Sequence, residues 1–137
     1  DWNLLIDKKV LLFEDNALNQ EISIALLESK GMKVSVASNG QAGVIIFENS
    51  ASNEYSAILM DRRMPGMDGL TATKKIRHLD RPDAKTIPII AMTADAFPDD
   101  IKECLEAGMN AHLSKPIDQN ALFTTLIKYI KRSECAQ

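Results

Sequence analysis

The sequence has little of what marks several common classes of protein. Its 137 residues include two cysteines, Cys104 and Cys135, which form neither a disulfide framework nor a zinc-binding spacing. No apolar run reaches the roughly 18 residues of a membrane-spanning helix, and no leader-like segment begins the chain. Phosphate loops of the GxxxxGK and GxGxxG types are also missing. We therefore expect a cytoplasmic domain, in a reducing compartment, that does not bind a membrane directly.

Charge and composition indicate a globular domain that does not bind nucleic acid. The 16 Lys and Arg residues against 19 Asp and Glu residues leave a net charge of −3, so no basic excess attracts a phosphate backbone. With 45% hydrophobic and 26% charged residues, the chain can bury enough apolar surface to fold. We predict one domain at residues 8–132. Because the chain does not begin with Met, we expect residues 1–7 and 133–137 to be flanking segments of a larger parent chain, which is free to be membrane-anchored.

Short apolar runs alternate with longer segments of helical period. Three runs are apolar throughout, as expected for strands buried on both faces, whereas two interleave polar residues, as expected for outer strands. The fully apolar runs are Val10–Phe13, Ala57–Met60 and Ile89–Met92, and the mixed runs are Val34–Ala37 and Ala111–Ser114. With right-handed crossovers, five β-α repeats predict a flavodoxin-like, doubly wound α/β fold whose parallel five-stranded sheet has the order 2-1-3-4-5.

Capping residues delimit the helices between these runs. Asp68 and Asp118 are predicted N-caps, Pro98 fits a first helical turn, and Gly108 ends the helix that Pro98 begins. The stretch Leu79–Thr86 is predicted to be the longest polar connection between elements.

Charged and hydroxyl side chains follow four of the five runs. Glu14 and Asp15 follow the first run, Asp61 the third, Thr93 the fourth and Lys115 the fifth. In such a sheet, ligands bind beyond the carboxyl ends of the strands, near the point where strand order reverses. Three carboxylates converging there repel one another, and a hard divalent cation relieves the repulsion. We expect Mg²⁺, with Mn²⁺ as an alternative, because Mg²⁺ takes few protein oxygens and completes its shell with water and phosphate oxygens.

A phosphoryl group is then the natural ligand of this edge. Lys115 can place a charge on one phosphoryl oxygen, and the Thr93 hydroxyl can donate to another. Asp61, nearest the middle of the sheet, can attack phosphorus and form an aspartyl phosphate. Each residue alone has an ordinary alternative, such as helix capping for Asp15 or a surface cation for Lys115. The prediction rests on their coincidence at one edge.

At these positions the sequence resembles the receiver domains of two-component response regulators, from about Lys8 to Lys131. The residues that carry the resemblance are the acidic pair Glu14-Asp15, the phosphoacceptor Asp61, the switch residue Thr93, the pair Lys115-Pro116 and the loop Met60–Gly69. The local sequence looks most like that of receivers of hybrid sensor histidine kinases at Glu14-Asp15-Asn16 with Asn19-Gln20, and at Thr93–Ala96.

The resemblance implies a phosphoacceptor signalling module. A phosphohistidine on a histidine kinase or a histidine phosphotransfer domain would pass its phosphoryl group to Asp61 in the presence of Mg²⁺. Asp15, Asp61 and the backbone carbonyl of Arg63 would bind the metal directly, and Glu14 would act through water. The domain would then switch conformation through Thr93 and remove its own phosphoryl group.

Further positions are assigned by the same resemblance. The Lys115-Pro116 peptide bond is expected to be cis. His112 stands where the family usually has an aromatic residue coupled to Thr93, and an imidazole there can add pH sensitivity. Arg63 and Asp95, two residues after the acceptor and the switch residue, would line the path of hydrolytic water and gate the lifetime of the phosphoryl group.

The resemblance also places two partners on the surface. The partner that carries the phosphohistidine is expected to meet the first helix near Leu18 and Asn19, and the loop at Pro116-Ile117. A downstream protein is expected on the face formed by the fourth helix, the fifth strand and the fifth helix.

The same residues argue against three other functions. A phosphatase of the haloacid dehalogenase type needs an acid two residues after its nucleophile, where this chain has Arg63 or Ala17. The domain is therefore not expected to be an enzyme for external substrates. FMN binding calls for a Ser/Thr/Gly-rich loop after the first strand, where this chain has Glu14–Ala17. An unphosphorylated binding scaffold would lack the acceptor, the acidic pair or the Lys, all of which this chain keeps.

Overall fold

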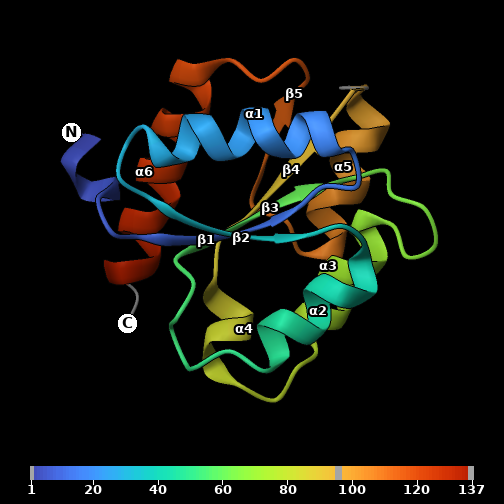
Figure 1. Cartoon of the computed structure of the whole chain (residues 1–137). Coiled ribbons are helices and arrows are strands. Elements are labelled where there is room, and N and C mark those ends of the chain that lie inside the picture. The colour runs from blue at the N-terminus through green and yellow to red at the C-terminus, as the bar shows by residue number, and fades with distance from the viewer. Residues whose placement is uncertain (1, 95–96, 136–137) are drawn as a thin grey trace.

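Figure 1 shows the computed structural model of the chain, which describes residues 2–94 and 97–135. Its centre is a sheet of five strands: β1 (Lys9–Phe13), β2 (Lys33–Ala37), β3 (Ala57–Asp61), β4 (Ile89–Thr93) and β5 (Ala111–Ser114). All neighbouring strands are parallel, and their order is β2-β1-β3-β4-β5. The predicted doubly wound fold and strand order are confirmed.

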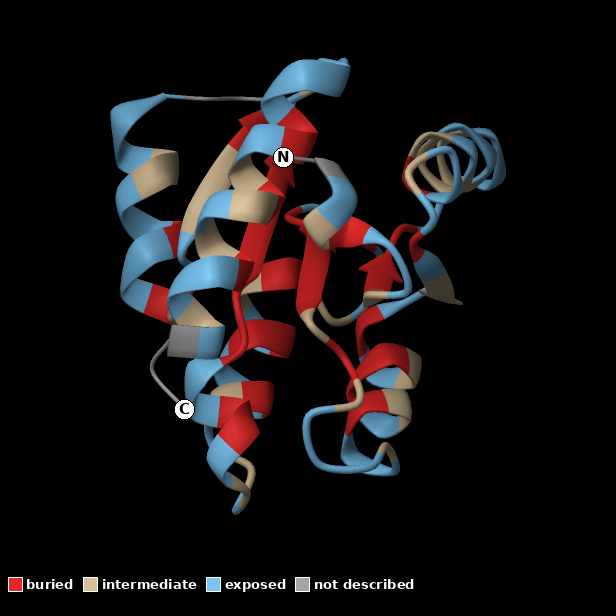
Figure 2. Ribbon diagram, turned by 90° about the vertical axis from the view of Figure 1, so that its left-hand side faces the viewer, coloured by how far each residue is buried: buried red, intermediate tan, exposed pale blue. Residues whose placement is uncertain are grey.

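Helices cover both faces of the sheet. The helices on one face are α1 (Ala17–Glu28) and α6 (Gln119–Cys135), and those on the other are α2 (Gly40–Glu48), α3 (Gly69–Arg77) and α5 (Pro98–Ala107). Side chains alternate along a strand, so Leu11 and Phe13 enter one apolar cluster while Val10 and Leu12 enter the other. Figure 2 shows the buried strands between helices whose outer faces are exposed. Burial on both faces fixes where each strand ends, and with it the residues that follow.

Local signals set the ends of the helices. Asp68 caps α3 and Asp118 accepts a hydrogen bond in the first turn of α6, as predicted. The cap of α1 is Asn16, not Asp15. Gly108 ends α5 with a φ of 115°, a left-handed conformation that glycine adopts without strain.

The polar connection predicted at Leu79–Thr86 contains a short helix that the sequence pattern did not reveal. This helix, α4, spans Pro82–Thr86. Arg81, directly before it, pairs with the carboxylate of buried Asp83 at 2.6 Å. Two charged residues of this segment thus pair with one another, and the segment lacks the apolar period that identifies a longer helix.

The residues before β1 also pack against the rest of the domain. A single 3₁₀ turn, η1 (Trp2–Leu5), ends in Leu5, which is fully buried in the apolar cluster that contains the inner residues of α6. Lys8 and Glu134 form an ion pair of 2.6 Å and thereby join the two ends of the described chain. None of the helices within the described residues is long and apolar enough to cross a membrane.

Candidate magnesium and phosphoryl site

Three carboxylates meet at the carboxyl ends of β1 and β3. One oxygen of each of Glu14, Asp15 and Asp61 lies within 4.8 Å of the other two. Glu14 and Asp61 are buried, whereas Asp15 is exposed. Because β1 and β3 pair directly, the residues that end them lie at the same edge of the sheet. Within the described residues this is the one cluster of its kind.

Hydrogen bonds hold Glu14 in place. Its N–H donates to the last carbonyl of β2 at 3.0 Å, and its carboxylate accepts a hydrogen bond of 3.2 Å from the N–H of Asn16. Gln20, in the first turn of α1, donates to the carbonyl of Glu14 at 2.6 Å. Burial raises the pKa of Glu14, and the nearby charge of Asp61 raises it further, against the opposing hydrogen bond from Asn16. Burial and the neighbouring carboxylate thus both disfavour the charged form of Glu14.

One ammonium group faces the carboxylates. Lys115 Nζ is 3.3 Å from Asp61 Oδ1 and 3.5 Å from Glu14 Oε1. The backbone N–H of Lys115 donates to the carbonyl of Thr93 at 2.9 Å, which extends the pairing of β4 and β5 toward the site. The Lys115-Pro116 peptide bond is cis, the isomer that the resemblance implies. With all three carboxylates ionised, their negative charges outnumber the positive charges of Lys115 and of Arg63, which also lines the cleft.

These residues line a cleft of about 260 Å³. Its lining consists of Glu14, Asp15, Asn16, Asn19, Asp61, Arg63, Thr93, Ala94 and Lys115. One water molecule occupies about 30 Å³ in the liquid, so the cleft has room for an ion, its water ligands and a phosphoryl group. Thr93, the last residue of β4, places a hydroxyl at this edge.

The donor set fits Mg²⁺. The carboxylate oxygens of Glu14, Asp15 and Asp61 are hard ligands, and their excess negative charge calls for a cation. The open cleft leaves space for the water molecules that Mg²⁺ retains. These three residues would hold the ion.

The loop after β3 lies close against Asp61. The N–H of Arg63 donates to Asp61 Oδ1 at 3.3 Å, and the N–H of Gly69 donates to the carbonyl of Arg62 at 3.0 Å. A Cβ at Gly69 would lie 2.5 Å from the Asp61 carbonyl oxygen, a distance that only the missing side chain of glycine avoids. Gly69 thus allows the loop to support Asp61.

Not all of the predicted residues that the structure describes join this cleft. His112 is half-buried on β5, in register with Ala91, and does not line the cleft. Asp95 lies outside the described residues. The sequence analysis assigned no role to Gln20, whose contact with Glu14 could have been suspected from its place in the first turn after the Asn16 cap.

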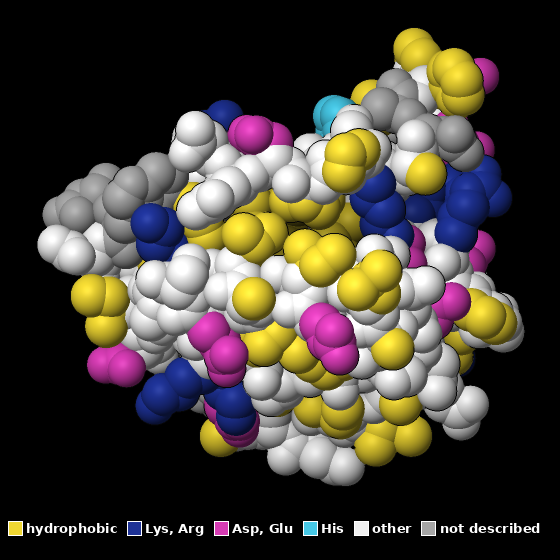
Figure 3. Space-filling model, turned by 45° about the horizontal axis from the view of Figure 1, so that its top comes forward, with side chains coloured by type: hydrophobic (Ala, Val, Ile, Leu, Met, Phe, Trp, Pro, Cys, Tyr) yellow, Lys and Arg dark blue, Asp and Glu magenta, His cyan; other side chains and the backbone are white. Residues whose placement is uncertain are grey.

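An apolar groove adjoins the cleft. It has a volume of about 150 Å³ and runs between α1 and the loop after β5; its lining is Glu14, Asn19, Ile22, Ser23, Met92, Lys115, Pro116 and Ile117. Figure 3 shows a hollow lined with hydrophobic side chains on the side of the molecule that carries α1. Leu18 and Ile22 of α1 are 63% and 51% exposed. Glu14 and Lys115 line both hollows, so the groove leads into the charged cleft.

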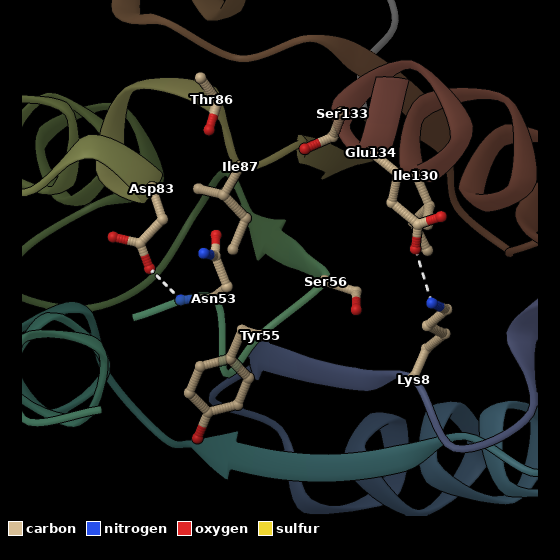
Figure 4. A pocket seen from close by; sticks show the side chains of 10 residues that line it. All are labelled: Lys8, Asn53, Tyr55, Ser56, Asp83, Thr86, Ile87, Ile130, Ser133 and Glu134. Carbon is tan, nitrogen blue, oxygen red and sulfur yellow. Dashed lines mark hydrogen bonds and ion pairs between the residues drawn. The ribbon is translucent and has the colours of Figure 1, made fainter. Parts of the chain in front are cut away.

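A polar cavity lies at the opposite end of the sheet (Figure 4). Lys8 and Glu134 form their ion pair at one side, and the carboxylate of Asp83 accepts a hydrogen bond of 2.9 Å from the N–H of Asn53. Its charged residues are thus already paired, and no predicted site residue lines it. The chemistry predicted from the sequence is therefore confined to the carboxyl end of the sheet.

Comparison with known proteins finds a family model that matches most of the chain. The family model of the response regulator receiver domain matches residues 10–127. The chain is 36% identical over 135 residues to hybrid signal transduction histidine kinase I of Dictyostelium discoideum, and 42% identical over 124 residues to an osmosensing histidine protein kinase of Saccharomyces cerevisiae. These matches cover 94% and 88% of this chain but 8% and 10% of the two kinases, so the chain spans about a tenth of their length.

Solved structures show the same similarity. The receiver domain of a sensor histidine kinase of Pseudomonas aeruginosa, described with a magnesium ion coordinated in its active-site cleft, has a TM-score of 0.82 and 39% identity. The match covers 91% of this chain and 98% of that one. A response regulator receiver domain protein of Clostridium thermocellum shares the fold, with a TM-score of 0.85 at 22% identity over 95% of this chain and 99% of that one.

Proposed function

Because this chain belongs to the family of response regulator receiver domains, we propose that it accepts a phosphoryl group on Asp61. The observation that carries the proposal is the buried Asp61 carboxylate, which lies 3.3 Å from Lys115 Nζ within the cluster of three carboxylates. The donor is a phosphohistidine of a histidine kinase or a histidine phosphotransfer domain.

The transfer exchanges one bond to phosphorus for another. An oxygen of Asp61 bonds to phosphorus while the bond to the donor's imidazole nitrogen breaks, and the imidazole keeps the electron pair. Lys115 and the Thr93 hydroxyl stabilise the phosphoryl oxygens. Glu14, Asp15, Asp61 and the backbone carbonyl of Arg63 would hold Mg²⁺, or Mn²⁺ in its place. When bound, the ion supplies positive charge to the phosphoryl oxygens.

Phosphorylation switches the domain through Thr93. The hydroxyl moves toward the phosphoryl group, and the space that it vacates lets His112 turn inward. Changing a domain from mostly off to mostly on requires roughly 3–5 kcal/mol of differential stabilisation. Charge-assisted hydrogen bonds from Thr93, Lys115 and nearby N–H groups to a dianion are strong enough to supply it.

The domain also removes its own phosphoryl group. Water attacks phosphorus, inorganic phosphate leaves, and the Asp61 carboxylate is restored. Arg63, which lines the cleft, and Asp95 control the access of this water. Arg63→Ala and Asp95→Ala should each change the rate of phosphate release severalfold more than the rate of phosphorylation. Equal effects on the two rates would contradict this role.

The phosphohistidine partner docks on the apolar groove. The groove opens into the cleft, and exposed Leu18 and Ile22 stand beside it. Leu18→Asp should slow transfer from the protein donor while phosphorylation by acetyl phosphate keeps its wild-type rate. Ile45→Asp is the matched control, since Ile45 is also exposed but lies on α2, on the other face of the sheet. A Leu18→Asp variant that slows both donors alike would argue against docking there.

A downstream partner meets the face of α5, β5 and α6, which are the fourth helix, fifth strand and fifth helix of the sequence prediction. Phe97 and Leu105, 66% and 52% exposed, offer apolar side chains at α5. The domain at residues 8–132 would be one part of a larger cytoplasmic or membrane-anchored parent chain, which we propose to be a hybrid histidine kinase. The domain itself turns over no external substrate.

Intact-mass measurement tests the proposed function. Incubation with acetyl phosphate and Mg²⁺ should add one phosphoryl group, about 80 Da, to the wild type. Asp61→Asn should gain nothing, because the amide is a poor nucleophile. Asp68→Asn is the control, since Asp68 is an acidic residue of the same loop that caps α3 and Asn caps equally well. An unchanged mass of the wild type, or a gain by Asp61→Asn, would overturn the proposal.

A further inference from the structure

Arg62 is a buried charge that the proposed transfer does not use. It follows Asp61 directly, and its backbone N–H donates to the carbonyl of Met92 at 3.0 Å, which fixes its position beside β4. Its side chain is 9% exposed. Burying a guanidinium is costly unless it finds partners, so its partners show what the residue does.

Those partners lie on α5. Arg62 Nη2 donates to Glu103 Oε2 at 2.8 Å and lies 3.6 Å from Asp100 Oδ1. Arg62 Nε is buried and has no hydrogen-bond partner within the described residues. The side chains of Asp100 and Glu103 are 20% and 54% exposed, so they meet the buried guanidinium from the surface of the domain. The ion pairs therefore tie the end of β3 to α5.

Two parts of α5, an amino-terminal part (residues 98–103) and a carboxyl-terminal part (residues 104–107), are attached differently. The first buried residue of the helix is Cys104, so the carboxyl-terminal part packs on the core. Arg77 also holds the carboxyl end, because it donates two hydrogen bonds, of 2.8 and 3.0 Å, to the carbonyl of Gly108. None of the residues of the amino-terminal part is buried, and Asp100 and Glu103 within it pair with Arg62 at the end of the sheet.

Helix α5 follows the proposed switch residue closely in the sequence. The helix begins at Pro98, a few residues after the switch residue Thr93. Under the proposed function Thr93 moves toward the phosphoryl group, and the amino-terminal part of α5 is the part of the helix nearest to Thr93 in the sequence. When this part moves while the carboxyl end stays anchored, Asp100 and Glu103 must move relative to Arg62.

We propose that Arg62, Asp100 and Glu103 form an ionic latch that holds the amino-terminal part of α5 in the position of the unphosphorylated domain. The latch rests on the proposed function, since phosphorylation of Asp61 is what it opposes. Closed, it reduces the affinity for a phosphoryl group. Opened, it favours the phosphorylated conformation. Arg62 is a positioning residue that acts through α5.

Beryllofluoride, a phosphoryl mimic, tests the latch. The full chain is titrated at saturating Mg²⁺, and amide chemical shifts report the half-saturating concentration. Glu103→Gln should lower this concentration about threefold, and Asp100→Asn with Glu103→Gln about tenfold. Glu106→Gln is the matched control: it removes the same charge from the same helix, but from an exposed pair with Lys102 at 3.9 Å. It should titrate like the wild type.

A double-mutant cycle isolates the contact. Arg62→Met replaces the guanidinium with an apolar chain of similar length, and in this background Glu103→Gln should no longer change the titration. Where Arg62→Met does not fold, Arg62→Gln serves the same cycle. The latch is overturned if Glu103→Gln titrates like Glu106→Gln, or binds beryllofluoride more weakly than the wild type. A wild type that shows no response to beryllofluoride overturns the proposed function itself, and the latch with it.

Discussion

The two ends of the sheet hold their charges in opposite ways. At the amino end, Arg81 donates hydrogen bonds of 2.6 and 2.8 Å to Asp83 and further ones of 2.8 and 3.0 Å to the carbonyls of Phe47 and Ser50 at the end of α2. At the carboxyl end, Lys115 faces three carboxylates at once and approaches two of them at 3.3 and 3.5 Å.

This difference separates what stabilises the protein from what makes it reactive. A buried charge with a full set of partners holds the chain together and has nothing left to offer a ligand. A cluster with excess negative charge weakens the fold, and it regains that free energy when a cation binds. The same residue types therefore stabilise the fold at one end and form the candidate binding site at the other.

The largest effect on stability should come from the amino end. Arg81→Ala leaves the buried Asp83 carboxylate without its cation, although the N–H of Asn53 still donates to it, and it should lower the free energy of unfolding by about 3 kcal/mol. Urea unfolding measures the change. Arg81→Lys keeps the charge but not the fork of donors, so its loss should be intermediate. If Arg81→Ala loses no more stability than the removal of an exposed ion pair, the two ends of the sheet do not differ in the way described.

The pH dependence of stability sharpens the same point. The hydrogen-bonded Arg81 guanidinium holds the pKa of Asp83 below its ordinary value, against the effect of burial. The stabilisation by Asp83 is therefore complete above the ordinary pKa of about 4 and is lost as the pH falls below it. Urea unfolding between pH 7 and pH 3 should show this loss in the wild type. In Asp83→Asn the loss should be smaller, and an equally steep decline would contradict the assignment.

A smaller effect of opposite sign is expected at the carboxyl end. Without Mg²⁺, Asp61→Asn removes one of the crowded negative charges and should raise the free energy of unfolding by about 1 kcal/mol. The variant should also lose the stabilisation that Mg²⁺ gives the wild type. Thermal unfolding with and without Mg²⁺ measures both changes. Asp68→Asn should stay close to the wild type, and a destabilised Asp61→Asn would show that Lys115 already balances the cluster.

The smallest effect belongs to a pair that is neither buried nor crowded. Lys102 and Glu106 face each other on the exposed side of α5 at 3.9 Å. Glu106→Gln should change the free energy of unfolding by less than about 0.5 kcal/mol, because solvent screens the pair. Urea unfolding measures this change. A change above about 1 kcal/mol would mean that exposed ion pairs contribute as much to the free energy of unfolding as the pair of Arg81 and Asp83.

The sequence predicts the reactive end better than the braced one. Apolar runs reveal the strands, topology brings their carboxyl ends together, and Glu14 and Asp61 must then meet. The contacts of Arg81 cannot be found in this way, because its partners come from α2, α4 and the loop between α2 and β3, none of which sequence spacing relates. The pairing of Arg62 with α5 is hidden for the same reason.

The crowded carboxylates are proposed to make Asp61 the acceptor of a phosphoryl group once Mg²⁺ is bound. Borohydride reduces an aspartyl phosphate to homoserine, so peptide mass spectrometry after treatment with acetyl phosphate locates the modified residue. We predict conversion of Asp61 alone, and only when Mg²⁺ is present. Conversion of a different acidic residue, or equal conversion of Asp61 without Mg²⁺, would contradict the account.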